Sequence, residues 1–207
     1  MNAPAPTIVN LVRLADATAQ PWRNGGGMTR ELLTWQRPDL PSSQGWSVRV
    51  SVADVARDGP FSAYPGVTRA FTVLEGEGVT LDWGDGRSRR LGPADDPLHF
   101  DGADAPGCQL SGGPTRDLNL MTRSIDGQAR MGRARPGESG PAPGRWRALY
   151  THAAGRLAIG DAEVSLEPGT LCWQAGPGGA DSPRWQWLQG TQAWWLELVP
   201  PSKEPAR

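Results

Sequence analysis

The sequence has few of the residues that most often bind metals or form disulfides. It contains two cysteines, Cys108 and Cys172, and two histidines, His99 and His152, among 207 residues. The cysteines are far apart and form no Cys-x-x-Cys arrangement, so neither a disulfide framework nor a zinc site is expected. The histidines have no ligating partner at short spacing, and the two-His-plus-Glu pattern of many metal sites is absent. The sequence therefore predicts no bound metal and no cofactor.

Other absences exclude further classes of protein. No charged start leads into an apolar run, and no stretch is long and apolar enough to span a membrane, so we expect a cytoplasmic protein without a membrane partner. The net charge of −1 argues against direct nucleic-acid binding. No Gly-x-Ser-x-Gly motif and no Gly-Lys-Ser/Thr after a glycine loop is present, which excludes two common catalytic and nucleotide-binding signatures.

What the chain has instead is glycine, proline and tryptophan. It contains 27 Gly, 20 Pro and 10 Trp, a composition that favours short strands and turns over long helices. The clearest strand signal is Trp46–Val52, where Trp46, Val48, Val50 and Val52 alternate with polar residues. The stretch Val52–Ala56 is at most one helical turn. The sequence therefore predicts an all-β protein.

One segment, Pro21–Leu32, concentrates unusual chemistry. It reads P-W-R-N-G-G-G-M-T-R-E-L, with three consecutive glycines between aromatic, amide and charged side chains. Glycine is costly to order and is retained where a backbone turns through positive φ or approaches a ligand closely. The segment predicts either a binding corner or a glycine-rich hairpin whose neighbours have no special role.

Several further motifs follow in a characteristic order. They are W-S-V-R-V-S-V-A-D-V, D-G-P-F-S-A-Y-P-G-V-T-R, L-E-G-E-G-V and R-D-L-N-L-M, found at Trp46–Val55, Asp58–Arg69, Leu74–Val79 and Arg116–Met121. With the glycine segment, this ordered set resembles the HutD/Ves family, strongly over residues 8–123 and in outline over 146–199. The resemblance implies a double-cupin fold and an association with histidine utilisation, but no defined reaction.

The expected architecture is a bicupin, with two jelly-roll (double-stranded β-helix) barrels in one chain. We expect a first barrel over 8–123, a connector rich in Gly, Pro and Arg over 124–145, and a second cupin-like portion over 146–200. The second portion is expected to pack with the first as one compact unit. Loosely similar sequences in the two halves agree with such a duplication.

A binding site is expected where polar strand faces meet inside the first barrel. Arg49 points away from its neighbouring valines, and Asp117 and Asn119 point away from Leu118 and Leu120. A buried arginine needs a paired group or a bound anion. The strand faces and the family motifs together predict seven ligand-binding residues. They are Trp22, Asn24, Arg49, Phe61, Arg69, Asp117 and Asn119.

The expected partner is a small anionic metabolite. Guanidinium groups match carboxylates, aromatic rings such as Trp22 and Phe61 can stack on a flat ligand, and Asn24 or Asn119 can bind a polar edge. The resemblance points to urocanate or a related histidine-pathway compound, bound without turnover. Two alternatives stay open: a metal-independent isomerase or lyase with Asp117 or Glu31 as base, and an interaction module with a vestigial pocket. A homodimer is compatible with the sequence.

Overall fold

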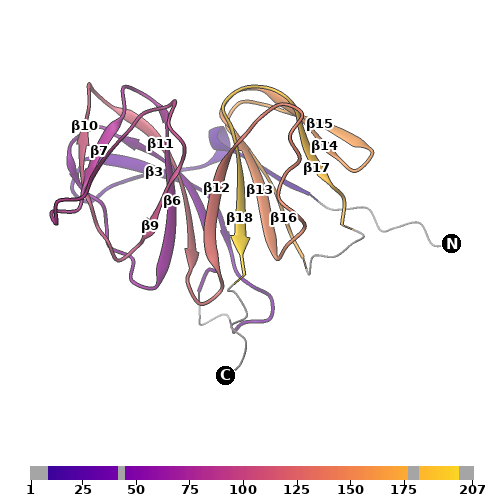
Figure 1. Cartoon of the computed structure of the whole chain (residues 1–207), viewed down its shortest axis with the longest axis horizontal. Coiled ribbons are helices and arrows are strands. Elements are labelled where there is room, and N and C mark those ends of the chain that lie inside the picture. The colour runs from indigo at the N-terminus through magenta and orange to yellow at the C-terminus, as the bar shows by residue number, and fades with distance from the viewer. Residues whose placement is uncertain (1–8, 42–44, 177–181, 201–207) are drawn as a thin grey trace. The chain divides into compact units, whose positions relative to one another are not determined.

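The computed structural model describes residues 9–41, 45–176 and 182–200. These residues form β-strands and a short 3-10 helix, η1 (Leu14–Asp16) (Figure 1). Residue 8, the first of the predicted first barrel, lies outside the described ranges. No described helix has the length and apolarity needed to cross a membrane.

The chain divides into two compact units, each described by itself. Among the described residues, the pocket unit consists of Asp16–Gly132 and Leu198–Pro200. The tryptophan-rich unit consists of Val9–Ala15 and of the described residues between Arg133 and Glu197. Both units are built from antiparallel sheets, as the jelly-roll bicupin prediction requires, and that prediction of fold class is confirmed.

The pocket unit contains two sheets. The larger has the order β2-β3-β4-β11-β6-β9, and the smaller has the order β5-β10-β7-β8. The strands of the larger sheet are β2 (Ala19–Pro21), β3 (Gly27–Trp35), β4 (Val48–Val55), β11 (Thr115–Arg123), β6 (Val67–Glu75) and β9 (Leu98–Asp101). Those of the smaller sheet are β5 (Gly59–Pro60), β10 (Gly107–Leu110), β7 (Val79–Asp82) and β8 (Ser88–Leu91).

Apolar side chains from both sheets meet in one core cluster. Phe71 and Val73 of β6 pack with Val79 and Leu81 of β7 and with Cys108 of β10. Burial of such side chains is the main favourable term in folding. The cluster therefore fixes the smaller sheet against one part of the larger sheet and leaves the polar face of β4 and β11 for another use.

Two further sheets lie mainly in the tryptophan-rich unit, and of their strands only Gln128–Gly132 and Leu198–Val199 are assigned to the pocket unit. Their orders are β1-β16-β13-β18-β12 and β15-β14-β17. The strands are β1 (Asn10–Arg13), β16 (Thr170–Ala175), β13 (Trp146–Thr151), β18 (Ala193–Val199), β12 (Gln128–Ala134), β15 (Ala162–Leu166), β14 (Gly155–Ile159) and β17 (Trp185–Gln189). The core of this unit includes Trp185, Trp187 and Trp195 beside Leu149 and Leu157.

The structure differs from the sequence prediction in three places. Residues 124–145, predicted as a connector, contain β12, whose Ala129 and Met131 are buried. Val52–Ala56 is not a helical turn, because β4 continues through Val55. The sequence pattern also indicates no strand at Trp146–Thr151, where the structure has β13: all six of its residues are buried, so it lacks the alternation that marks a half-exposed strand.

Candidate functional site

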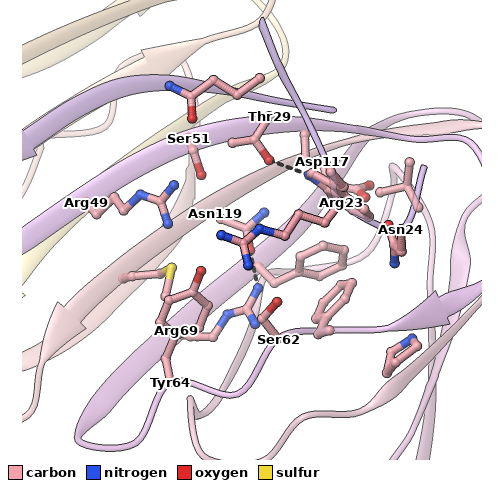
Figure 2. A pocket seen from close by; sticks show the side chains of 18 of the residues that line it. Arg23, Asn24, Thr29, Arg49, Ser51, Ser62, Tyr64, Arg69, Asp117 and Asn119 are labelled. Carbon is pink, nitrogen blue, oxygen red and sulfur yellow. Dashed lines mark hydrogen bonds between the residues drawn. The ribbon is translucent and has the colours of Figure 1, made fainter. Parts of the chain in front are cut away.

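A cavity of about 490 Å³ opens in the pocket unit against the polar face of β4 and β11. Its volume is in the range of small-molecule sites, about 300–1,000 Å³. All seven residues predicted to bind a ligand line it: Trp22, Asn24, Arg49, Phe61, Arg69, Asp117 and Asn119. Figure 2 shows Asn119 between the three arginines Arg23, Arg49 and Arg69. The expected convergence of these side chains on one cavity is therefore observed.

Strand register brings the polar residues together. Residues directly opposite each other on neighbouring strands point to the same face of the sheet. Across β4, β11 and β6 the successive rows are Arg49–Met121–Arg69, Ser51–Asn119–Phe71 and Ala53–Asp117–Val73. One sheet face thus places two arginines in one row, an amide in the next and a carboxyl group in the third.

Arg69 is the buried cation of this site. The residue is 6% exposed, and its Nη2 donates a 2.7 Å hydrogen bond to Oδ1 of Asn119. The guanidinium also lies 4.8 Å from the ring centre of Phe61 and 5.1 Å from that of Phe100. Burial, with a smaller contribution from nearby Arg49, lowers the pKa of Arg69 to about 10, so the group remains charged at neutral pH.

The hydrogen-bonding capacity of Arg69 is incompletely used. Its buried Nε has no hydrogen-bond partner among the described residues, and no ion pair joins Arg69 to a carboxylate within those ranges. An uncompensated buried charge is strongly destabilising. Arg69 is therefore a strong candidate for contact with an anionic ligand.

Asp117 is the buried acid of the site. It is fully shielded from solvent, and its Oδ2 accepts a 3.2 Å hydrogen bond from the Thr115 hydroxyl. Its other oxygen, Oδ1, has no partner among the residues that the structure describes. Burial raises the pKa of Asp117 to about 8, with Thr115 opposing the shift and Asp54 adding to it. The carboxyl group is thus mostly protonated at neutral pH and does not neutralise a neighbouring arginine.

Arg49 has a different partner from the one predicted. We expected it to meet Asp117 and Asn119, but its Nε donates a 2.8 Å hydrogen bond to Oε2 of Glu31. Glu31 lies opposite Ser51, two residues from Arg49 on the same face of β4, so its carboxylate reaches Arg49 diagonally across the two strands. Arg49 still lines the cavity, but part of its charge is compensated by Glu31.

The glycine-rich segment forms one rim of the cavity. Gly25 has a φ of 67°, which favours glycine, and Oδ1 of Asn24 accepts a 3.0 Å hydrogen bond from the Gly26 amide. A Cβ atom on Gly27 would lie 2.4 Å from the Asp54 carbonyl oxygen and 3.3 Å from the ring of Trp22. The close approach of β3 to β4 at this point, and the position of Trp22, therefore require glycine.

Trp22 is held by its indole nitrogen. Its Nε1 donates a 2.8 Å hydrogen bond to the Thr29 hydroxyl across the glycine turn. The hydrogen bond holds the ring at the cavity wall. The side-chain oxygen of the neighbouring Asn24, Oδ1, already accepts a hydrogen bond within the turn. The Asn24 amide nitrogen is the remaining polar group that this side chain can offer to a ligand.

Sequence reasoning missed several residues of the wall. Arg23, Ser51, Ser62, Tyr64 and Met121 also line the cavity. Ser51 and Met121 follow from the same alternation that identified Arg49 and Asn119. Arg23, Ser62 and Tyr64 lie outside the strands, where no periodic pattern indicates the direction of a side chain.

The described residues do not fit a metal site of the kind common in this fold class. Among them, no group of three or more His, Cys, Asp or Glu side chains could hold an ion. Nε2 of His99 accepts a hydrogen bond from the Met131 amide at 2.9 Å, so that nitrogen is already in use. Both cysteines are free and buried, and burial raises the pKa of each thiol to about 12.

Comparison with known proteins agrees with this fold and motif set. The sequence model of the HutD family matches residues 14–186. An uncharacterised 21.2 kDa protein in the hutC 3′ region of Pseudomonas putida is 38% identical over 55% of this chain and 57% of its own length. A Ves protein of Escherichia fergusonii is 34% identical over 53% of this chain and 56% of its own. The chain thus aligns with little more than half the length of these curated relatives.

Solved structures extend the likeness over most of the chain. HutD from Pseudomonas fluorescens SBW25, in a formate condition, superposes with a TM-score of 0.78 at 25% identity. The superposition covers 94% of this chain and 100% of that one. With the family match over most of the sequence, the resemblance first indicated by the motifs is confirmed: this chain belongs to the HutD family.

Proposed function

We propose that this protein binds a small carboxylate in the pocket unit and thereby modulates histidine utilisation, without turnover. The observation on which the proposal rests is Arg69, a buried and charged guanidinium whose Nε has no hydrogen-bond partner among the described residues. A carboxylate is the natural acceptor for such a group, because its two oxygens match the guanidinium donors.

The surroundings of Arg69 suit a flat ligand. Asn119 shares a hydrogen bond with Arg69, which leaves the amide nitrogen of Asn119 to donate to a ligand oxygen. Phe61 lies against the guanidinium on the cavity wall, and Trp22 lines the same cavity. Urocanate, with a planar conjugated carboxylate, has the size and shape that these groups favour.

The link to histidine utilisation is supported by relatives. One relative is described by its place in the hutC 3′ region, and a structural relative is HutD itself. For this chain the regulatory role is a proposal that follows from membership of the family. It predicts that loss of the pocket changes growth on histidine without loss of a catalytic step.

A thermal-shift screen tests the binding step. Urocanate, histidine, glutamate and formate are compared at equal concentrations with the carboxamide counterpart of each effective compound. A bound ligand raises stability by mass action, about 2.7 kcal/mol at 100 times its Kd. We expect a carboxylate to raise the melting temperature of the wild-type protein, its amide to have a weaker effect, and Arg69→Ala to lose the response.

Arg57→Ala serves as the control in this screen. Arg57 is exposed and close to the glycine turn in sequence, but it does not line the cavity. Its removal changes the net charge as Arg69→Ala does, so an equal loss of response in both variants would contradict a specific pocket. Absence of any response to all carboxylates in the wild-type protein would also contradict the proposal.

One observation favours a second function, metal-independent acid–base catalysis. Asp117 has a pKa of about 8 and an oxygen without a hydrogen-bond partner among the described residues, and it lies at the cavity. A catalytic pKa near the working pH is suited to proton transfer. Isomerisation or elimination of a bound carboxylate, followed by NMR and abolished in Asp117→Asn, would support this function instead.

A further inference from the structure

The pocket holds more positive charge than its own acidic groups compensate. Three arginines line it, Arg23, Arg49 and Arg69. Glu31 binds Arg49, while Asp117 is mostly protonated at neutral pH because burial raises its pKa to about 8. Among the described residues, neither Arg23 nor Arg69 forms an ion pair with a carboxylate. Two positive charges therefore remain without a carboxylate partner in that part of the chain.

These two charges come from different sides of the cavity. Arg69 lies on β6, buried between Phe61 and Phe100. Arg23 belongs to the exposed turn between β2 and β3, and Figure 2 shows its side chain directed into the cavity toward the side that holds Asn119 and Arg69. Like charges that face one cavity repel each other, and the repulsion is stronger where water is scarce. An anion between them removes this cost.

The backbone that carries Arg23 is well defined. The Trp22 amide donates to the Gly27 carbonyl at 2.9 Å, and the Gly25 amide donates to the Trp22 carbonyl at 3.0 Å. The Gly26 carbonyl in turn accepts hydrogen bonds from the amides of residues 56 and 57 at 2.8 and 3.1 Å. The turn thus fixes the starting point of the Arg23 side chain, whose length allows the guanidinium to adapt to a bound group.

We infer that the pocket is selective for a dianion with two separate acidic groups, one bound by Arg69 and Asn119 and the other by Arg23 at the rim. This inference rests on the proposed function, since it assumes that a small carboxylate occupies the cavity, and it adds the charge and bipolar shape of the ligand. A cavity of about 490 Å³ is large enough for two such groups joined by a short carbon chain.

The number and spacing of its negative charges distinguish this ligand class from a monoanion and from phosphate. A monocarboxylate supplies one negative charge for two arginines that lack a carboxylate partner. Inorganic phosphate carries its charge at one point, so its competition with a diacid separates a compact dianion from one with two acidic groups. Selectivity for a dicarboxylate should therefore depend on Arg23, whereas binding of the first carboxylate should depend on Arg69.

Calorimetric titration with matched probes tests the inference. The probes are succinate, glutarate and adipate, the monomethyl ester of each, and inorganic phosphate. The proteins are the wild type, Arg23→Ala, Arg69→Ala and the control Arg57→Ala, which removes an exposed arginine outside the cavity wall. Thermal melts of all four proteins check that each is folded.

We expect the wild type to prefer at least one diacid over its monoester by about tenfold or more, the typical effect of one further charged contact. Arg23→Ala should reduce that preference to about twofold while monoester affinity stays within about twofold of the wild type. Arg57→Ala should keep the preference. Arg69→Ala should weaken the diacid and the monoester alike, and phosphate should bind more weakly than the diacid.

Several results would overturn the inference. If monoesters bind the wild type as tightly as diacids, and both depend on Arg69, the proposed function stands and the dianion inference is wrong. The same holds if Arg23→Ala keeps the full preference, or if phosphate competes as well as the best diacid. If the wild type binds none of the probes, both the inference and the carboxylate pocket are contradicted.

Discussion

Two ionisable side chains of the pocket respond to the same burial in opposite ways. Arg69 stays charged although burial lowers its pKa to about 10, whereas burial raises the pKa of Asp117 to about 8 and leaves that group mostly neutral. The reason is that desolvation disfavours the charged form of either group. The cavity wall therefore carries a cation and a neutral acid, with the row of Asn119 between them, and this combination suits an incoming anion.

Asp117 makes stability depend on pH. Between the ordinary value of 3.8 and about 8, the folded protein holds a proton that the unfolded chain has released. The free energy of unfolding should therefore fall as pH rises through this window, by up to about 1.4 kcal/mol per pH unit for one proton, and level off above it. Denaturant melts from pH 4 to 9 measure this slope.

Asp117→Asn is the informative variant for that slope. Asparagine has nearly the same shape but no titrating proton, so the variant should lose this contribution to the pH dependence. Asp161→Asn, at an exposed position, is the control and should retain the wild-type profile. An unchanged slope in Asp117→Asn would contradict the raised pKa.

Arg49 should contribute less to carboxylate binding than Arg69. Its side chain is 21% exposed and its Nε is bound to Glu31, whereas Arg69 is buried without a carboxylate partner among the described residues. We expect Arg49→Ala to weaken carboxylate binding by about 1–2 kcal/mol, since partly exposed charge pairs are worth less than buried ones. Arg49→Lys should recover only part of this loss, because an ammonium lacks the planar fork.

Calorimetry on Arg49→Ala, Arg49→Lys and Glu31→Gln separates two roles for this arginine. If Arg49 contacts the ligand, Glu31→Gln should maintain or improve affinity, because it frees the guanidinium. If Arg49 serves only the ion pair with Glu31, all three variants should bind normally and melt at lower temperature. The second pattern would remove Arg49 from the binding site.

At the scale of elements, alternation predicted the faces of strands but not their partners. The pattern of β4 correctly placed Arg49 on the other face of the sheet from Val48 and Val50, because successive side chains on a strand point to alternate faces. The partner of Arg49, Glu31, lies on the neighbouring strand β3, and the alternation within β4 does not indicate which strand pairs with it or in which register. Strand β13 was missed for the complementary reason that a strand buried on both faces shows no alternation.

The glycine segment was predicted as a special corner, and the structure shows which glycine has the tightest surroundings. Gly27→Ala would place a Cβ atom 2.4 Å from the Asp54 carbonyl oxygen. Because both atoms belong to paired strands, relief requires a shift of β3 against β4. We expect the substitution to lower the free energy of unfolding by about 1–3 kcal/mol, the usual cost of forcing extra volume into a packed site.

Gly132→Ala is the matched control for this substitution. Gly132 lies in β12 outside the positive-φ region, and among the described residues no atom beyond its chain neighbours lies within 4 Å of the position that an added methyl group would take. The change should alter stability by less than about 1 kcal/mol. Equal stability of the wild type and Gly27→Ala in denaturant melts would show that the close approach of β3 and β4 is not required.

At the scale of the whole molecule, the family and fold were predictable because the ordered motifs are specific. The motifs from the glycine segment to Arg116–Met121 all lie in the pocket unit, and their strands and turns place the seven predicted side chains on one cavity. The second half was less predictable. Its core relies on tryptophans, including Trp185, Trp187 and Trp195, whose burial is set by tertiary packing rather than by local pattern.

The whole protein is predicted to bind no stoichiometric transition metal. The described residues contain no group of three or more potential ligands, and one nitrogen of His99 is already hydrogen-bonded. A fold that depends on a metal loses stability when the metal is removed. Because we expect no bound metal here, a chelator should change neither the melting temperature nor the carboxylate affinity. Elemental analysis after dialysis checks this directly. Stoichiometric metal that is lost in His99→Ala would contradict the prediction.

The central claim is that buried Arg69 binds a small carboxylate, and calorimetric titration of urocanate into wild type, Arg69→Ala and Arg69→Lys tests it most directly. We expect binding to the wild type, a loss of about 2–5 kcal/mol in Arg69→Ala, and partial recovery in Arg69→Lys. Circular dichroism melts on the same samples must show that the variants are folded. A folded Arg69→Ala protein that binds urocanate as tightly as the wild type would contradict the account.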